Sequence, residues 1–244
     1  MSDHGHSRTE RLDLADANLR EWEATVLVSD AETGIVLDRS AFYPGGGGQP
    51  PDHGVLLWGG VETRIVGTRR GDDLYLIPAD GDPLPPAGTA VRGAVEDARR
   101  SSLMRTHSGR HLLAGVVFRD FGAMVTGGNM EPGVARMDFD LPDIPADFKD
   151  RIAQACAVEV AADRAIRVDN LSVAQALAIP DIIRTATNML PELEIVRIVD
   201  IVGLDVQADG GTHVASTKQI GGIEVVKVEN KGKANRRLRV RLTD

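Results

Sequence analysis

Short β-prone runs, separated by glycine and proline, make up most of the first 96 residues, and this pattern restricts the fold more than any other feature of the chain. The runs are ATVLVSD, TGIVLD, GVLLWGG, TRIVGTRR, DLYLIPA and TAVRGAV. Strands repeated at roughly ten-residue intervals, without long helical periods, are typical of a small antiparallel barrel or sandwich. We therefore predict a glycine-rich β-barrel domain over residues 1–96, with segment 78–88 as a hairpin loop inside it.

The pattern changes near Glu96, where helical signals begin. Apolar residues recur at helical spacing from Asp97 to Phe121, and residues 146–165 form a second amphipathic segment. Strand-like runs return at VARMDFDL, ELEIVRIVDIVGLDVQ, IEVVKVEN and RLRVRL. Two helices with about four or five strands predict a second domain of the α+β class over residues 97–244, with an antiparallel sheet and its helices on one face.

Composition indicates the solubility and cellular location of the protein and limits its possible metal ligands. Hydrophobic residues make up 42% and charged residues 26% of the chain, no run reaches the roughly 18 apolar residues of a membrane span, and the polar N-terminus lacks the apolar core of a secretory signal. We expect a soluble, cytoplasmic protein with no membrane partner. The single cysteine, Cys156, excludes an internal disulfide and a multi-cysteine zinc site, so any metal needs nitrogen and oxygen ligands.

Basic residues gather near the C-terminus, although the net charge of −8 argues against a general nucleic-acid-binding surface. The basic residues are Lys227, Lys231, Lys233, Arg236, Arg237, Arg239 and Arg241. Two interpretations remain open, a phosphate-binding strip or a solvated edge strand that carries positive charges against aggregation. Arginine alternates with apolar residues from residue 237 to 242, which predicts a strand with one basic face.

The segment RTHSGRHLL places His107 and His111 four residues apart within the first predicted helix. At 3.6 residues per turn, the two imidazoles lie on one face and could share a metal ion. A metalloprotease helix would carry glutamate directly after the first histidine, but Ser108 stands there. The protease interpretation is therefore disfavoured, and a helix face with hydrogen-bonded imidazoles is the alternative to a ligand pair.

A second pair with the same spacing, Asp209 and His213, lies in DGGTH between two strand-like runs. Together the two pairs offer three imidazole nitrogens and one carboxylate, which is a complete donor set for a zinc-type site. Alone, DGGTH would be a tight turn in which the glycines provide the bend. The repeated spacing on a helix and on a turn favours a metal site.

The segment AFYPGGGGQPPDHG contains four consecutive glycines, Gly45 to Gly48. Because each glycine costs conformational entropy on folding, such a run indicates unusual backbone dihedrals or close backbone approach. A phosphate-binding loop would continue with lysine and serine or threonine, whereas Gln49, Pro50 and Pro51 follow here. Nucleotide binding is disfavoured, and the loop is either a hairpin turn or a segment that leans over an active site.

Four ordered motifs give this chain a resemblance to a known family. FYPGGGGQPPDHG, RTHSGRHLL, GGNMEPGVARMDFDL and DGGTHVASTKQIGGIEVVKVENKGKANRRLRVRL resemble segments of the alanyl-tRNA editing proteins, which are freestanding relatives of the editing domain of alanyl-tRNA synthetase. The resemblance covers most of residues 20–244. It implies a glycine-rich barrel followed by a two-layer α+β editing domain, and a hydrolase that removes serine, and sometimes glycine, from mischarged tRNA(Ala) without ATP.

The resemblance also implies a ligand set for one divalent metal. His107, His111 and His213 match the family's ligands, and Asp209 stands where the family usually has cysteine. Zn²⁺ is the expected metal, and the carboxylate makes Fe, Mn, Co or Ni acceptable as well. The metal would either activate water or hold the amino group of the substrate. The alternative is a family member that has lost its metal.

An editing site should hydrogen-bond the serine hydroxyl, since an apolar pocket rejects one extra hydroxyl only weakly. Candidates for that contact are Ser108, Thr126 and Thr212, while Gln49 either reaches the cleft or serves the loop. The acceptor stem of the mischarged tRNA would meet Lys231, Lys233, Arg236 and Arg237. No protein partner is inferred. A deacylase of another aminoacyl-tRNA, a non-catalytic metal-stabilised tRNA-binding module and a small-molecule hydrolase are the alternatives.

Overall fold

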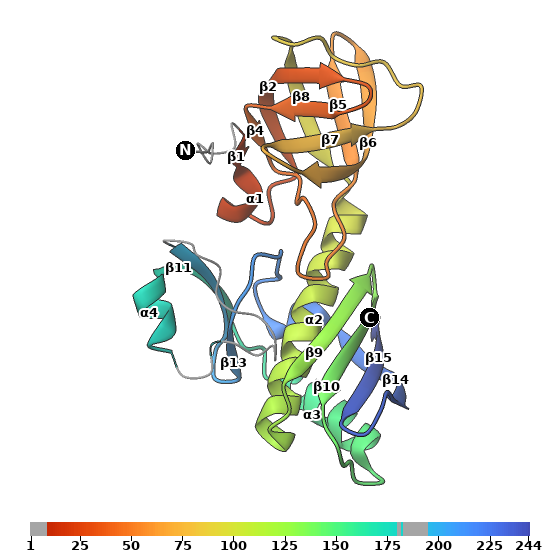
Figure 1. The fold of residues 1–244 in the computed structure, drawn as a ribbon, viewed down its shortest axis with the longest axis vertical. Helices are drawn as coiled ribbons and strands as arrows, with labels where there is room; N and C mark the ends of the chain where they lie inside the picture. Colours follow the sequence, from red (N-terminus) through yellow and green to blue (C-terminus); the bar gives the residue numbers. More distant parts are fainter. Residues whose placement is uncertain (1–8, 180–181, 183–194) are drawn as a thin grey trace. The chain divides into compact units, whose positions relative to one another are not determined.

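The computed structural model describes residues 9–179, 182 and 195–244 (Figure 1). It divides into two compact units, the first formed by residues 1–46 and 50–101 and the second by residues 47–49 and 102–244. The predicted domain boundary between residues 96 and 97 stays a prediction. Within the described ranges, no helix has the length and apolar character needed to cross a membrane.

The first unit contains a closed barrel of six antiparallel strands in the order β2-β3-β7-β6-β5-β8. These strands are β2 (Glu21–Asp30), β3 (Gly34–Leu37), β5 (Gly54–Trp58), β6 (Val61–Arg70), β7 (Leu74–Pro78) and β8 (Ala90–Val95). Each of the six β-prone runs therefore forms one strand, and the barrel predicted from the sequence is confirmed. The prediction of a hairpin loop at residues 78–88 is wrong: this segment connects β7 to β8, which pair with other strands of the barrel and not with each other.

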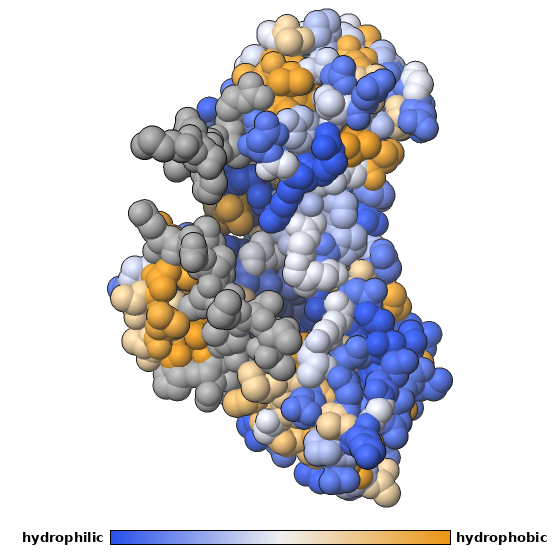
Figure 2. All heavy atoms as spheres, viewed as in Figure 1, coloured by the Kyte–Doolittle hydropathy of each residue, from blue (hydrophilic) through white to orange (hydrophobic). Residues whose placement is uncertain are grey.

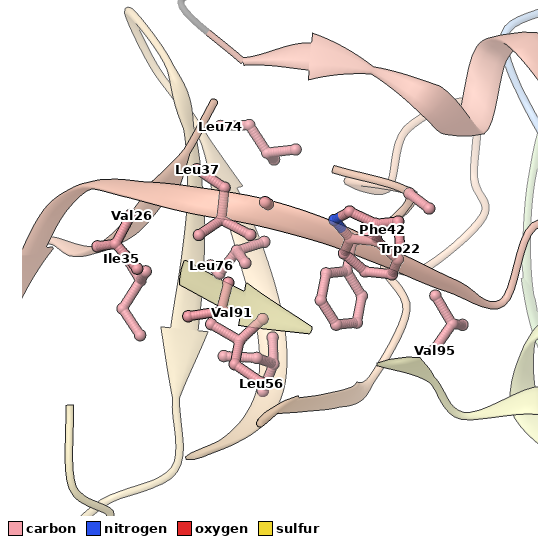
Figure 3. Close-up of a cluster of buried hydrophobic side chains, with 13 residues drawn as sticks. Trp22, Val26, Ile35, Leu37, Phe42, Leu56, Leu74, Leu76, Val91 and Val95 are labelled. Carbon is pink, nitrogen blue, oxygen red and sulfur yellow. The ribbon is translucent and has the colours of Figure 1, made fainter. Parts of the chain in front are cut away.

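The barrel interior is filled by alternate residues of its strands (Figure 3). Along β2, Trp22, Ala24 and Val26 are buried while the residues between them are exposed, as expected for a strand with one face in a core. Trp22 meets Phe42 edge to face, with ring centroids 5.1 Å apart. A Cβ at Gly93 would lie 2.3 Å from the Trp22 ring, so the indole requires glycine on the neighbouring strand.

Three short elements accompany the barrel in the first unit. Strand β1 (Glu10–Arg11) pairs in parallel with β4 (Arg39–Ser40), and helix α1 (Leu12–Ala15) follows β1 directly. Thr9, just before β1, donates its hydroxyl to the Leu37 carbonyl at 2.7 Å. This bond holds the start of the described chain against β3.

The glycine loop, residues 43–52, is closed at its base by a buried ion pair. Asp52 accepts a hydrogen bond from the Tyr43 backbone N–H at 2.6 Å and donates its own N–H to the Tyr43 carbonyl at 3.1 Å. The Arg100 guanidinium donates to the Asp52 carboxylate at 2.9 Å and to the Ala41 carbonyl at 2.6 Å, and both charged side chains are fully buried. The loop is thus fixed where it leaves and re-enters the barrel unit.

The second unit contains a four-stranded antiparallel sheet in the order β14-β15-β10-β9 (Figure 1). Its strands are β9 (Val125–Glu131), β10 (Val134–Asp140), β14 (Gly222–Asn230) and β15 (Asn235–Thr243). Helix α2 (Asp97–Phe121) lies beside this sheet, where a Cβ on Gly109 would be 3.3 Å from Leu242, and α3 (Phe148–Ala161) packs on β14. Gly109, the middle residue of RTHSGRHLL, therefore permits close helix–sheet packing.

A smaller sheet in the same unit has the order β11-β12-β13. It consists of β11 (Ile166–Ser172), β12 (Ile195–Ile201) and β13 (Asp205–Ala208), and helix α4 (Val173–Leu177) packs on it through Ala176. The loop DGGTH begins directly after β13, and a short 3-10 helix, η1 (Thr217–Ile220), follows it. The sheet thus delivers Asp209 at the end of a strand.

The predicted α+β class is confirmed. The structure also contains strands and element boundaries that the sequence pattern did not predict. The run ELEIVRIVDIVGLDVQ bends after Ile201 into two strands, and its first three residues lie outside the described ranges. Strands β9 and β11 were not expected, because β9 contains Gly127 and Gly128 and β11 is a polar edge strand. The second helix is shorter than the predicted segment 146–165.

Candidate metal centre

Helix α2 and the loop after β13 bring the four predicted ligands together. His107 and His111 lie one turn apart on α2, and the ligand atoms of His107, His111, Asp209 and His213 all lie within 4.8 Å of one another. The Nε2 atoms of His107, His111 and His213 lie 3.5, 3.7 and 3.1 Å, respectively, from the Asp209 carboxylate. The same nitrogen of each ring therefore faces the carboxylate.

The spacing of these atoms fits a single divalent ion. Nitrogen and oxygen ligands about 2.0–2.2 Å from a tetrahedral metal lie about 3.3–3.5 Å from one another. The measured carboxylate–imidazole distances bracket that range. Three imidazoles and one carboxylate form a donor set that Zn²⁺ accepts and that Fe, Mn, Co and Ni tolerate. The residues present thus fit a divalent metal.

Burial sets the protonation states of the cluster. Burial lowers the pKa of His213 to about 3 and lowers the pKa of His107 as well. At Asp209 burial raises the pKa, but the interactions with the surrounding imidazoles outweigh it and hold the pKa well below the ordinary carboxyl value. His107 and His213 are therefore neutral and Asp209 is ionised near neutral pH, which are the forms that bind a metal.

The backbone of DGGTH orients Asp209 directly. The Gly211 N–H donates to the Asp209 carboxylate at 2.5 Å, and the Arg197 guanidinium donates to the Asp209 carbonyl at 3.0 Å. The turn predicted at Gly210 and Gly211 is therefore also the support of a candidate ligand. The sequence pattern did not indicate the role of Arg197, which lies on β12 and reaches the loop across the smaller sheet.

Ser108 lies behind the His213 ring. Its hydroxyl oxygen is 3.1 Å from His213 Nδ1, the ring nitrogen opposite the one that faces Asp209, and it accepts the Val214 N–H at 3.1 Å. The Ser108 side chain is fully buried between α2 and the DGGTH loop. The residue that replaces a protease glutamate in RTHSGRHLL thus contacts one of the candidate ligands.

Gln49 and Thr212 meet beside His107. The Gln49 carbonyl oxygen is 2.7 Å from His107 Nδ1 and accepts the Thr212 N–H at 3.2 Å, while the Gln49 amide donates to the Thr212 hydroxyl at 2.9 Å. Both side chains are buried. The structure therefore brings Gln49 and Thr212 to the cluster, and their catalytic role stays a prediction.

Arg110 was not among the predicted site residues, although it lies three positions after His107 and thus near the same helix face. It is 8% exposed and donates to the Gly47 carbonyl at 3.1 Å. Thr126, which was predicted, lies on β9 and accepts a hydrogen bond from the Asn235 amide at 2.9 Å. Its predicted contact with substrate stays a prediction.

The predicted tRNA-binding arginines form hydrogen bonds with other side chains, whereas the predicted lysines are exposed. Arg237 forms two hydrogen bonds with Asp138, at 2.7 and 2.8 Å, and Arg236 donates to the Asn230 side chain at 3.1 Å. Lys231 and Lys233 are exposed in the β14–β15 loop. Figure 2 shows hydrophilic side chains gathered over β10 and β15.

The interpretation of the basic strip as an edge strand is wrong for its arginines, although Lys227 lies on β14, which is at the edge of the sheet. Strand β15 lies between β14 and β10 and is hydrogen-bonded on both sides, so its backbone groups are already paired. The alternation of Arg237, Arg239 and Arg241 with buried residues is confirmed as a basic face. These three arginines pair with acids of the neighbouring strands: Asp138, Glu229 and Glu224.

Fold and site together define a two-part α+β protein, with a small barrel and a buried cluster of potential metal ligands. The model of the family described as "Threonyl and Alanyl tRNA synthetase second additional domain" matches residues 196–239. The alanyl-tRNA editing protein AlaX-M of Saccharolobus solfataricus is 36% identical, over 94% of this chain and 97% of its own length. The AlaX-M protein of Methanosarcina acetivorans is also 36% identical, over 97% of this chain and 100% of its own length.

The chain belongs to the family of alanyl-tRNA editing proteins of the AlaX-M type, and it is an aminoacyl-tRNA hydrolase. The resemblance carried by the four sequence motifs is confirmed. Alanine--tRNA ligase of Pyrobaculum neutrophilum is 35% identical over 91% of this chain, but the match covers only 25% of the ligase. The chain therefore corresponds to one part of that larger protein.

Proposed function

We propose that this protein is a metal-dependent trans-editing hydrolase that acts in the cytoplasm and removes serine, and also glycine, from mischarged tRNA(Ala). The convergence of one nitrogen from each of three imidazoles and one carboxylate oxygen within 4.8 Å carries the metal-dependent part of this proposal. The names of the relatives, which are editing proteins and alanine ligases, support the choice of tRNA(Ala). Because the match to the editing protein covers almost all of this chain, it supports an activity of the whole chain and not of one part of it.

His107, His111, Asp209 and His213 would hold the divalent ion. When bound, this ion would supply a Lewis acid at the ester, which either activates water or orients the substrate's amino group. Asp209 supplies one negative charge and the neutral His107 and His213 supply none, so that a divalent cation keeps a net positive charge in the centre. Zn²⁺ is the proposed ion, with Fe, Mn, Co or Ni as the other candidates because Asp209 offers a hard oxygen ligand.

Hydroxyl-bearing side chains of the protein would recognise the serine hydroxyl of the substrate. Of the three candidate hydroxyl groups, those of Ser108 and Thr212 are buried and held by Val214 and Gln49, respectively. Thr126 is only partly buried. The Thr126 hydroxyl accepts the Asn235 amide N–H but keeps its own proton to donate, and this partial exposure supports Thr126 as the group that distinguishes serine from alanine.

The tRNA backbone is proposed to meet the β14–β15 loop. Lys231 and Lys233 are exposed there and carry charges that phosphates attract. Arg236 lies at the start of β15 beside the same loop and hydrogen-bonds the Gly232 carbonyl at 3.2 Å, which fixes the loop. Arg237 is the weakest of the four proposed contacts, since its guanidinium is already paired with Asp138.

Deacylation assays test the proposal. Ser-tRNA(Ala) and Gly-tRNA(Ala) should be hydrolysed by metal-loaded protein, Ala-tRNA(Ala) much more slowly, and Thr-tRNA(Thr) not at all. Removal of the metal with a chelator should abolish turnover, and Zn²⁺ should restore it. If metal-loaded protein turned over none of these charged tRNAs, the editing proposal would fail, and a tRNA-binding module without catalysis would replace it.

Elemental analysis tests the ligand set separately. His111→Ala and Asp209→Ala proteins should contain far less metal than the wild type, because each variant removes one of four donors. The analysis should use a chain that lacks His4 and His6, which could bind metal on their own. Wild-type metal content in both variants would refute the four-ligand centre.

A further inference from the structure

Gln49, the residue after the four glycines, has a determined hydrogen-bonding orientation. Its side-chain oxygen accepts the backbone N–H of Thr212 at 3.2 Å, and its amide nitrogen donates to the Thr212 hydroxyl at 2.9 Å. A backbone N–H can only donate, so the atom of Gln49 that faces it must be the carbonyl oxygen. The side-chain amide therefore cannot be turned by 180° without losing this bond.

That orientation fixes the tautomer of His107. The same Gln49 oxygen lies 2.7 Å from His107 Nδ1 and carries no hydrogen, so Nδ1 must carry the proton of this hydrogen bond. In a neutral imidazole the other nitrogen, Nε2, then has the free lone pair. Nε2 is the atom that lies 3.5 Å from the Asp209 carboxylate. His107 is thus held with its lone pair directed into the cluster.

We propose that Gln49 is a positioning residue for the metal centre, which sets the tautomer and ring orientation of His107 and thereby links the glycine loop to metal affinity. The inference rests on the proposed metal site. Side chains that bind the outer nitrogen of a ligating imidazole typically contribute 10–100-fold to metal affinity. A neutral amide acts here in the place where carboxylates are common.

The glycines give Gln49 its position. Gly47 and Gly48 have φ angles of 57° and 82°, and their carbonyls accept hydrogen bonds from Arg110 and from the Met130 N–H, each at 3.1 Å. A Cβ on Gly48 would lie 3.0 Å from the Gly128 carbonyl and 3.1 Å from Arg110. Side chains on this turn would therefore push the loop away from β9 and α2, and Gln49 would lose contact with His107.

Zinc affinity of three variants tests the proposal. Full-length protein, stripped of metal, is titrated with Zn²⁺ against a chromogenic chelator. Gln49→Leu should weaken binding about 10–100-fold, because it removes the acceptor for Nδ1–H. Gln49→Glu should bind at least as tightly as the wild type, since a carboxylate can accept from both Nδ1–H and the Thr212 N–H. Thr212→Val, which removes only the contact to the amide nitrogen, should stay within a few-fold of the wild type.

A second measurement separates tautomer control from a general loosening of the loop. Long-range ¹H–¹⁵N spectra of the metal-free protein, with His107 assigned through a His107→Asn variant, should show Nδ1–H in the wild type and in Gln49→Glu. In Gln49→Leu the ring should populate the Nε2–H form. The proposal is overturned if Gln49→Leu keeps wild-type zinc affinity and the Nδ1–H signature, or if Gln49→Glu loses zinc as severely as Gln49→Leu.

The two proposals fail in distinguishable ways. A wild-type protein that binds none of Zn²⁺, Fe²⁺, Mn²⁺, Co²⁺ and Ni²⁺ would refute the proposed metal centre. The spectra of the metal-free protein would still report whether Gln49 controls the His107 tautomer.

Discussion

A side chain at position 211 would occupy the space of His107, because the Cβ of an alanine there would lie 2.0 Å from His107 Cε1 and 2.2 Å from Nδ1. Gly211 also donates its N–H to the Asp209 carboxylate. One glycine backbone therefore supports two of the four candidate ligands. Its φ angle is not in the left-handed region, so the requirement is for space and not for an unusual backbone conformation.

Gly211→Ala should abolish stoichiometric zinc binding, because the imidazole must move by more than the tolerance of a metal–ligand bond. Gly210→Ala is the matched control: the neighbouring glycine has nothing within 4 Å of an added Cβ and also lacks a positive φ. Elemental analysis of the two purified proteins decides the matter. Equal metal content in both would show that the loop adapts and that the contact does not constrain the centre.

Asp209→Cys should change metal preference more than it changes occupancy. A thiolate is a soft ligand that favours Zn²⁺, whereas the carboxylate suits harder ions such as Mn²⁺ and Fe²⁺. In competition titrations the variant should therefore bind Zn²⁺ at least as well as the wild type and lose affinity for Mn²⁺. Asp209→Asn, which keeps the shape but removes the charge, should weaken both metals. An unchanged ratio of Zn²⁺ to Mn²⁺ affinity in Asp209→Cys would show that residue 209 is not a ligand.

The metal-free protein should lose stability as the pH falls below about 6.5. His213 has a pKa of about 3 when folded against an ordinary value of 6.5, so the unfolded chain binds more protons between these values. The stabilisation is therefore complete above pH 6.5 and is lost as pH falls towards 3, with about 2 kcal/mol lost between pH 7 and pH 5. Urea unfolding at these two pH values measures the effect, and a His213→Gln protein should show a clearly smaller difference. Identical pH dependence in the two proteins would contradict the buried neutral state of His213.

Local patterns in the sequence predicted the elements that carry the site. The spacing of His107 and His111 placed them on one helix face, and six strand-like runs predicted the six barrel strands. Both follow from periodicity, which is a property of neighbouring residues. The candidate cluster of four residues was likewise assembled from two pairs with equal spacing.

Contacts between distant segments could not be predicted in this way. Gln49 meets Thr212 across 163 positions of sequence, and Ser108 meets His213 across 105. The sequence around Gln49 and around Ser108 contains no pattern that indicates these distant contacts. We therefore predicted that Ser108 recognises the substrate, although its hydroxyl contacts the candidate ligand His213. The steric requirement at Gly211 was missed for the same reason, since DGGTH alone is equally compatible with a simple turn.

The buried pair of Arg100 and Asp52 should contribute strongly to stability. Each side chain is fully buried, so Arg100→Met would leave the Asp52 carboxylate without its partner in the interior at a cost of roughly 3–5 kcal/mol. Arg64→Met, which breaks an exposed pair with Asp82 in the same unit, should change stability much less because solvent screens that pair. Chemical denaturation of the two variants compares them directly. If Arg100→Met were no less stable than Arg64→Met, the base of the glycine loop would not depend on this pair.

Removal of Lys231 and Lys233 should weaken tRNA binding and reduce its dependence on salt. Both side chains are exposed in the β14–β15 loop, and each contact with a phosphate contributes about 0.7–0.9 to the slope of log affinity against log salt. The double variant Lys231→Gln/Lys233→Gln should therefore lower the slope by about one to two, measured by filter binding of tRNA(Ala) over a range of salt concentrations. A control that removes two exposed charges elsewhere, Lys149→Gln/Arg167→Gln on α3 and β11, should leave the slope unchanged. Equal effects of the two double variants would indicate general electrostatic attraction, and the β14–β15 loop would then have no particular role in binding the acceptor stem.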